Sequence, residues 1–213
     1  MKPYKYIAAF LLKNEADDLY AFMLTLPWTD HYPFVKRISF GPQMKPVPRA
    51  GRSSNTNTQK PPHPQILLAL QEKIQTQYNC RFNSLECHLH QDERAKVDAH
   101  VDAPPGPIAM VSVGQPRRFK VKNIQQDAAE IYTLAHGSLL SFFGGIKHSM
   151  PTEKHPCTPR ISLIFRYVPK RLAKNGKYRT PEQRREGLAE YKSAQRIRGA
   201  PVLVGLGGLE LPT

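Results

Sequence analysis

His100 and Asp102 lie two positions apart in a stretch that alternates polar and apolar residues. If residues 99–102 form a strand, these two side chains leave the same face and converge, while Val101 turns to the core. An imidazole and a carboxylate placed in this way are two ligands of a metal site; otherwise they are two polar residues at a strand end. A histidine from a distant strand would complete the two-histidine, one-carboxylate triad that binds non-haem Fe(II), and His148 is the candidate.

A second alternating pattern runs from Arg160 to Arg166. As a strand, this segment sends three apolar side chains to one face and four residues to the other, namely Arg160, Ser162, Ile164 and Arg166. Two guanidinium groups on an inward face are costly to bury unless an anion pairs with them. A dicarboxylate such as 2-oxoglutarate, chelating the metal at one end, would supply that anion.

The composition predicts a polyanionic partner. The chain has 213 residues, enough for one domain with a substantial core, and a formal net charge of +14. Such a charge favours nucleic acid, with a membrane surface as the weaker alternative and solubility alone as the simplest explanation. No signal peptide or membrane-spanning apolar run is recognisable, and the three cysteines show no paired spacing. We therefore expect an intracellular, reduced protein without membrane attachment, in the cytoplasm, nucleoid or nucleus.

The N-terminal third is expected to contain two helices and a basic segment. Apolar spacing predicts helices over residues 14–26 and 64–78, an opening strand over 4–12 and a strand over 34–40. Between residues 36 and 60 there are six lysines and arginines and no acidic residue. This segment is read as a basic flap or lid, or, over 51–60, as a disordered loop.

From residue 81 the pattern changes to short strands separated by turns, which is typical of a sandwich or barrel. We expect an α+β chain with a double-stranded β-helix, or jelly-roll, core. The domain prediction is 1–80 for the N-terminal helices and flap, 81–169 for the core and 170–213 for a basic extension. The predicted core strands cover 82–90, 97–102, 107–114, 117–122, 130–134, 138–143, 147–150 and 160–168.

Residues 82–168 resemble the catalytic core of the AlkB family of Fe(II)/2-oxoglutarate dioxygenases, which act on alkylated nucleobases. The resemblance is strongest to members that act on duplex DNA. It implies iron at His100, Asp102 and His148, and 2-oxoglutarate held by Arg160 and Arg166, with Ser162 beside them. The matching segments are 82–83, 100–102, 108–114, 117–119, 134–140, 148–151 and 159–166, in family order and with family spacing.

The resemblance also suggests contacts to nucleic acid. Pro48 and Arg49 resemble the family's substrate flap, and Phe40 lies where duplex-acting members carry an aromatic finger. Because a base must leave the duplex to be reached, Phe40 would fill the vacated stack, unless it is a core residue beside a turn. Lys36, Arg37 and Arg117 are further candidates for phosphate contacts.

Two histidines depart from the family pattern. At the positions where the family carries Asn and Tyr that hydrogen-bond 2-oxoglutarate, this chain has His88 and His90. Both face the iron ligands in the predicted strand, so they could donate to a carboxylate. They could equally be extra metal ligands, a product of drift or a sign of an altered co-substrate. His31, His63 and His155 are expected to be solvated, and His136 to be a turn residue.

Beyond the core, the segment from Lys170 to Arg198 carries ten basic residues and three glutamates. A helix over about 181–199 is expected, either binding a nucleic-acid backbone or lying solvated on the domain. The resemblance implies a monomeric oxidative demethylase of N-alkylated bases, of the 1-methyladenine or 3-methylcytosine type, that consumes molecular oxygen. The alternatives are a hydroxylase that modifies bases and a catalytically silent nucleic-acid-binding module.

Overall fold

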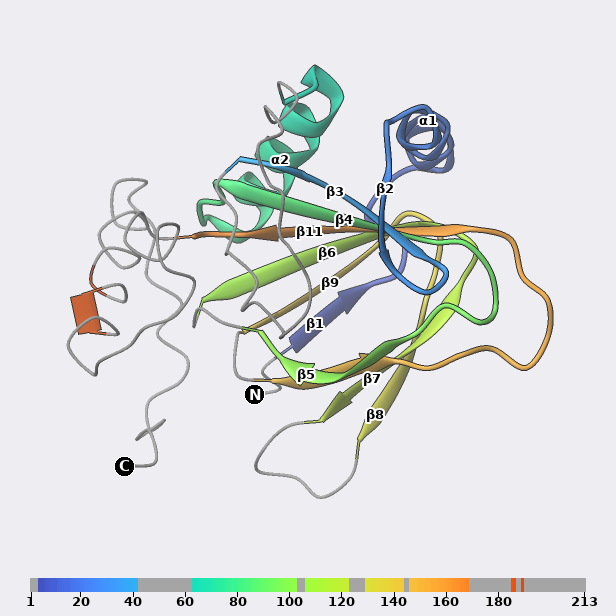
Figure 1. Cartoon of the computed structure of the whole chain (residues 1–213). Helices are drawn as coiled ribbons and strands as arrows, with labels where there is room; N and C mark the ends of the chain where they lie inside the picture. The colour runs from blue at the N-terminus through green and yellow to red at the C-terminus, as the bar shows by residue number, and fades with distance from the viewer. Residues whose placement is uncertain are drawn as a thin grey trace.

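The computed structural model describes residues 4–41, 63–102, 106–122, 129–143 and 146–168, together with 185, 186 and 189. Its strands form two antiparallel sheets that face each other (Figure 1). The larger sheet has the order β1-β9-β6-β11-β4-β3-β2 and the smaller one β5-β10-β7-β8. The strands are β1 (Tyr4–Ile7), β2 (Thr29–Tyr32), β3 (Val35–Phe40), β4 (Ser84–His90), β5 (Val97–Val101), β6 (Pro107–Gly114), β7 (Arg117–Lys122), β8 (Glu130–Leu134), β9 (Ser138–Phe143), β10 (Lys147–Met150) and β11 (Arg160–Arg166).

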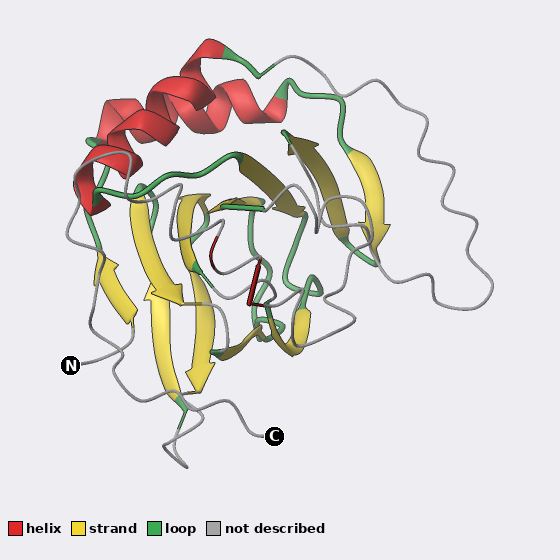
Figure 2. Cartoon of the chain, turned by 90° about the vertical axis from the view of Figure 1, so that its left-hand side faces the viewer, coloured by secondary structure: helices red, strands yellow, loops and turns green. Residues whose placement is uncertain are grey.

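Two helices, α1 (Lys13–Leu24) and α2 (Gln65–Tyr78), cover the outer face of the larger sheet (Figure 2). The Glu15 carboxylate accepts a hydrogen bond from the Leu12 amide at 2.8 Å, which satisfies one free N–H at the start of α1. The α2 helix ends at Asn79, which takes the left-handed conformation that closes many helices. Each helix buries one apolar stripe against the sheet, including Leu19 and Met23 of α1 and Leu67 and Ile74 of α2.

The central strand β11 separates two apolar clusters. Ile161, Leu163 and Phe165 join the cluster beneath the helices, whereas Ile164 packs on the cluster between the sheets. The alternation expected for this strand is therefore confirmed. Arg160 and Arg166 share the inner face with Ile164, so the fold directs both guanidinium groups into the space between the sheets.

The expected jelly-roll core is confirmed, and each predicted core strand agrees with an observed strand to within two residues at either end. Two local expectations are wrong. The opening strand stops at Ile7, and Val101 is 48% exposed because it points away from His100 and Asp102, to the outer face of the smaller sheet. Strand β2 was not predicted from the sequence. The basic flap around Pro48 and Arg49 lies outside the described residues, as does the C-terminal extension apart from 185, 186 and 189, which are helical.

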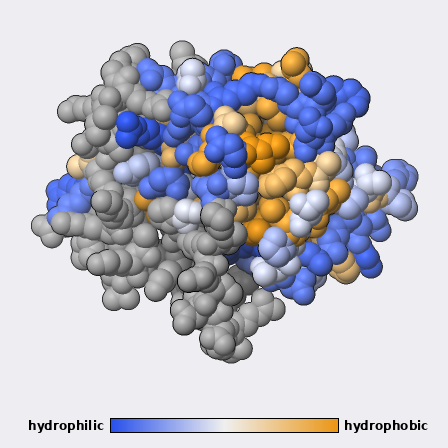
Figure 3. Space-filling model, turned by 90° about the horizontal axis from the view of Figure 1, so that it is seen from above, coloured by the Kyte–Doolittle hydropathy of each residue, from blue (hydrophilic) through white to orange (hydrophobic). Residues whose placement is uncertain are grey.

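Within the described residues, neither helix has the length and apolar character needed to cross a bilayer. Seen from the helix side, the surface carries apolar side chains among polar ones (Figure 3). Leu12, Leu24 and Leu68 are exposed on or beside the two helices. These residues lie on the outer side of the larger sheet and take no part in the polar site between the sheets.

Candidate active site

The predicted metal ligands come together at the edge of the smaller sheet. His100 of β5 and His148 of β10 are directly opposite each other in the antiparallel register, and their ring centroids lie 4.3 Å apart. Asp102 follows β5 and brings its carboxylate to 3.6 Å from His100 Nε2 and 3.7 Å from His148 Nε2. One donor atom from each residue lies within 4.8 Å of the other two. His100 on β5, Asp102 directly after it and His148 on the neighbouring strand thus form a compact donor set.

Hydrogen bonds to the backbone fix both imidazoles in the form that binds a metal. His100 Nδ1 lies 2.8 Å from the Asp98 carbonyl, and His148 Nδ1 lies 2.9 Å from the Ile146 carbonyl. Because a carbonyl can only accept, each Nδ1 donates a proton to it, which leaves Nε2 as the ring atom that would bind a metal. Both Nε2 atoms face Asp102, so the three donors are oriented before any metal arrives.

The protonation of this group also suits a metal. Burial opposes ionisation of Asp102, but Arg166 and the two imidazoles outweigh it and hold the pKa of the carboxyl below its usual range. Burial lowers the pKa of His148, which lies under the rings of Phe119 and Phe142. The hydrogen bond to Asp102 raises the pKa of His100, with burial acting against it. A carboxylate and a neutral buried imidazole are therefore in place near neutral pH.

Arg166 links this donor set to the larger sheet. Its Nη2 lies 3.2 Å from Asp102 Oδ2 and its Nη1 lies 3.5 Å from Glu86 Oε2. Glu86 also receives His88 Nε2 at 3.0 Å and Arg37 Nε at 3.4 Å. Burial disfavours ionisation of Glu86, but these partners hold its pKa far below the usual range. The arginine is thus positioned from both sides by carboxylates.

Arg160 lies buried at the other end of β11 from Arg166, without a carboxylate partner among the described residues. It donates to Ser112 Oγ at 2.8 Å and to Ser162 Oγ, and Ser162 in turn contacts His90 Nε2 at 3.3 Å. Burial, with a smaller effect of Arg117, lowers the pKa of Arg160 to about 9, so it remains charged near neutral pH. Burial and the charge of Arg160 depress the pKa of His90 well below its usual value, so that imidazole is neutral.

Three buried nitrogens in this region have no hydrogen-bond partner in the described part of the chain: Arg160 Nε, Arg166 Nε and His90 Nδ1. Unpartnered buried donors are rare in folded proteins, and a buried guanidinium without a carboxylate is rarer still. A small dianion would satisfy both the charge and the donors. The residues therefore fit 2-oxoglutarate, and the His100, Asp102 and His148 donors fit the two-histidine, one-carboxylate ligation of Fe(II).

The two histidines that depart from the family pattern have separate surroundings. His90 contacts Ser162 and lies with Arg160, at the end where the anion fits. His88 is paired with Glu86, and its ring centroid lies 5.4 Å from that of His31. His31 was expected to be solvated, but it lies on β2 against His88. A cofactor contact by His88 stays a prediction.

Two of the predicted nucleic-acid contacts are wrong. Phe40 is fully buried in the cluster beneath the helices, where its ring stacks on His63, so it cannot enter a base stack. Arg117 is 1% exposed and donates to the carbonyls of Asp92 and Ala95. In both cases the side chain of a residue at a strand end is buried and makes contacts inside the protein. For Phe40, the alternative of a core residue beside a turn is confirmed.

The remaining residues predicted to contact nucleic acid differ in where they lie. Lys36 and Arg37 are neighbours on β3 and so point to opposite faces of the sheet. Arg37 turns inward and pairs with Glu86. A contact between Lys36 and nucleic acid remains a prediction. Pro48 and Arg49 lie outside the described residues.

His136 is a turn residue, as expected. Its Nδ1 accepts a hydrogen bond from the Gly114 amide at 2.8 Å, and its Nε2 lies 3.1 Å from Asp17. Gly114 has a φ of +90°, and a Cβ there would lie 2.5 Å from the Pro159 carbonyl oxygen. The turn beside Arg160 therefore requires glycine and is fastened by His136.

Sequence reasoning overlooked Glu86 and Ser112. Glu86 alternates with His88 and His90 on one strand, so the period of two could have revealed it. Ser112 is an isolated serine in an apolar strand, and nothing in the sequence marks it as the partner of Arg160.

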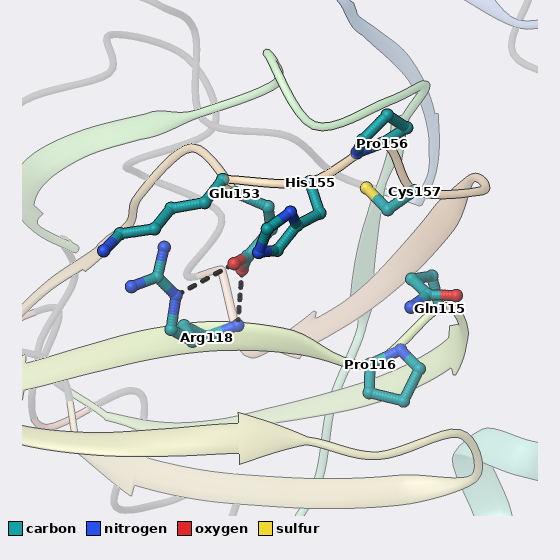
Figure 4. A pocket seen from close by; sticks show the side chains of 8 residues that line it. Gln115, Pro116, Arg118, Glu153, His155, Pro156 and Cys157 are labelled. Atoms are coloured by element: carbon teal, nitrogen blue, oxygen red, sulfur yellow. Dashed lines mark hydrogen bonds and ion pairs between the residues drawn. The ribbon is translucent and has the colours of Figure 1, made fainter.

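A surface pocket lies away from this chemistry, between the β6–β7 turn and the loop after β10 (Figure 4). Its lining includes Arg118, which donates to Glu153 at 2.9 Å, together with His155 and Cys157. Burial raises the pKa of the Cys157 thiol, which disfavours the nucleophilic thiolate. None of the predicted metal or anion ligands lines this pocket.

Half of the chain is similar in sequence to curated proteins. No protein-family model matches the chain. The chain is 36% identical to the alpha-ketoglutarate-dependent dioxygenase alkB homolog 3 of Bos taurus, across 50% of this chain and 43% of that protein. The Homo sapiens protein of the same name is 32% identical across the same shares. The matched half of the chain is AlkB-like. The chain spans less than half the length of these relatives.

Solved structures agree with the AlkB-like fold. The structure described as OsALKBH1 superposes with a TM-score of 0.62 and 15% identity, covering 79% of this chain and 98% of that one. A prolyl hydroxylase from Trichoplax adhaerens, solved with a hypoxia inducible factor peptide, gives 0.58 and 8%, covering 83% and 88%. At such identities the likeness concerns the fold, which is that of 2-oxoglutarate oxygenases.

Proposed function

We propose that this chain is an Fe(II)- and 2-oxoglutarate-dependent dioxygenase that removes N-alkyl groups from nucleobases, of the 1-methyladenine or 3-methylcytosine type, in DNA or RNA. The observation that carries the proposal is the presence of two features on the inner side of the sheets. A His100, Asp102 and His148 donor set contacts Arg166, and Arg160, which shares the inner face of β11 with Arg166, lies buried without a carboxylate partner among the described residues. Together they offer a place for a metal and for a dicarboxylate.

Each part of the site has a defined task in this reaction. His100, Asp102 and His148 would hold the iron, while Arg160 and Arg166 would neutralise and orient the carboxylates of 2-oxoglutarate. When bound, iron and 2-oxoglutarate supply the oxidising power that converts an N-methyl group to a hydroxymethyl group, with O2 consumed and 2-oxoglutarate released as succinate and CO2. The hydroxymethyl group then leaves as formaldehyde, which restores the N–H of the base.

Phe119 and Phe142 flank His148 with ring centroids at 5.5 and 4.9 Å. They exclude water from that side of the donor set, which favours a neutral imidazole and protects the reaction from solvent. Arg166 keeps Asp102 ionised and turned toward the two imidazoles.

The nucleic-acid substrate is supported by the net charge of +14 and by the AlkB-like core. A base inside a duplex cannot reach a buried site, so the target would be flipped out or already single-stranded. Because Phe40 is buried, the remaining sequence candidates for strand contacts are Lys36, the flap around Pro48 and Arg49, and the basic C-terminal segment. An intracellular monomer acting on nucleic acid is part of the same proposal.

The test measures succinate and formaldehyde release from oligonucleotides that carry 1-methyladenine or 3-methylcytosine, in single- and double-stranded form. Reactions contain Fe(II), 2-oxoglutarate and ascorbate, and His100→Ala is the control. Formaldehyde that disappears in the control supports the demethylase and reveals the strand preference. Succinate without formaldehyde would keep the oxygenase and reject these substrates. Neither product, despite bound metal, would favour a silent binding module.

A further inference from the structure

His31, Glu86 and His88 form a second cluster of donor side chains, on a different sheet from His100, Asp102 and His148. One donor atom of each lies within 4.8 Å of the other two, and all three residues are partly exposed. We propose that these three residues bind a divalent metal ion in addition to the iron, and that zinc is the metal their donors favour. The proposed activity does not require this site.

The fold directs the three side chains to one point. Glu86 and His88 lie two positions apart on β4 and therefore share its inner face. His31 comes from the edge strand β2, whose pairing with β3 shifts register between Asp30 and Tyr32. A bulge of this kind turns a side chain out of its regular direction and is common beside functional sites. Here the irregular residue is His31, and its ring centroid lies 5.4 Å from that of His88.

The donor set has the chemistry of a zinc site. Two imidazoles and one carboxylate bind zinc at about 2.0–2.2 Å and leave a fourth position for water or substrate. At those lengths, tetrahedral geometry separates neighbouring donors by about 3.4 Å. His88 Nε2 and Glu86 Oε1 lie 3.0 Å apart. Small side-chain rotations would therefore suffice to close the three donors around an ion.

The positive neighbours of Glu86 do not close the site to a cation. Arg37 and Arg166 approach Glu86 at 3.4 and 3.5 Å, whereas charge-assisted hydrogen bonds have lengths of about 2.7–2.9 Å. Arg166 also shares its charge with Asp102. Both contacts to Glu86 are thus longer than such bonds, so neither guanidinium group occupies the carboxylate at full hydrogen-bonding distance.

Zinc stoichiometry of the metal-free protein tests this inference without any activity assay. Equilibrium dialysis against Zn²⁺ is compared for the unmodified protein, His31→Ala, His100→Ala and the double variant. His155→Ala is the matched control, because His155 is an exposed histidine outside both clusters. Circular dichroism confirms that each variant is folded. His31 is partly exposed on an edge strand, so its replacement leaves the core unchanged.

We expect two zinc ions in the unmodified protein and in His155→Ala, one in each single-site variant and none in the double variant. The variant that loses His31 should bind the second equivalent at least about 10-fold more weakly, since it lacks one of three ligands. If the unmodified protein bound one zinc ion and His100→Ala bound none, the second site would be disproved. So would two zinc ions that persist in His31→Ala. Either result leaves the proposed dioxygenase untouched, because zinc dialysis does not measure that activity and His31 has no part in the proposed reaction.

Discussion

Arg166 Nη2 and Asp102 Oδ2 lie 3.2 Å apart, although their residues are 64 positions apart in the chain and belong to different sheets. The contact joins the strand that carries the two arginines to the segment that carries two of the three predicted metal ligands. It holds Asp102 ionised and limits the orientations of its carboxylate. Metal binding and anion binding are therefore coupled through one guanidinium group.

Replacement of Arg166 by alanine should weaken both functions at once. Without its partner, Asp102 loses its main source of stabilisation as a carboxylate, and a contact of this kind is worth about 10- to 100-fold in metal affinity or activity. Titration with Fe(II) or Mn²⁺ and succinate release measure the two effects. Arg118→Ala serves as the control, since Arg118 pairs with Glu153 at the surface pocket. An unchanged metal affinity in Arg166→Ala would contradict the coupling.

Replacement of Arg160 by methionine should separate stability from co-substrate binding. Removing a buried charge that has no carboxylate partner in the described residues is often neutral or stabilising, so the Tm of the free protein should stay the same or rise. The rise in Tm that 2-oxoglutarate produces with Mn²⁺ in the unmodified protein should disappear. Thermal unfolding with and without 2-oxoglutarate measures both. A methionine variant that keeps this rise would show that Arg160 does not hold the co-substrate.

Phe40→Ala should lower the free energy of unfolding by about 3–5 kcal/mol, because a fully buried aromatic ring is removed from the core. Urea unfolding measures the loss. Tyr32→Ala is the comparison, since Tyr32 is about half exposed on β2 and should change stability by about 0.5 kcal/mol or less. If Phe40→Ala were as stable as the unmodified protein and lost only activity on duplex DNA, the aromatic-finger hypothesis would return.

Glu15 should make stability depend on acid pH. It contacts Lys73 of α2 at 2.8 Å and accepts the Leu12 amide, and these bonds lower its pKa, with burial acting against them. Because the pKa is lower in the folded protein, the stabilisation is present above the unfolded pKa and disappears as pH falls through the folded value. Glu15→Gln should cost about 1 kcal/mol or less near pH 7, given its partial exposure.

Chemical unfolding of both proteins at pH 7 and pH 3 measures the Glu15 contribution. The two should differ at pH 7, and the difference should shrink as pH falls below the ordinary glutamate pKa and the carboxyl of the unmodified protein takes up a proton. Asp98→Asn removes an exposed carboxylate next to Lys96 and should cost less at pH 7. A difference that stays constant across this range would mean that the charge of Glu15 does not stabilise the fold.

The sequence predicted the core strands and the metal ligands because both depend on a short period. Alternation fixes which side chains share a face, and His100, Asp102, Arg160 and Arg166 follow that rule. Turns could also be read locally, as His136 illustrates. The convergence of Asp102 and Arg166 required the resemblance to the AlkB family in addition, since no local pattern says which strands face each other.

The errors concern exposure, which depends on the position of a strand in its sheet. Val101 alternates as a core residue would, but it points to the outer face of the smaller sheet. Phe40 and Arg117 lie near strand ends like surface residues, yet the helices and the loop around Asp92 cover them. His31 could not be placed because a register shift, which no residue type in β2 announces, decides its direction.

The edge position of β5 has one more consequence. Among the strands that the structure describes, β5 is hydrogen-bonded only to β10, and most of its residues are exposed. An ion held by His100, Asp102 and His148 would act as a crosslink between β5 and its neighbour, closing a loop of 46 to 48 residues between the first two ligands and the third. Amide hydrogens of β5 should therefore exchange with solvent much faster when the ion is removed, while those of β11, which is enclosed by β6 and β4, keep their protection.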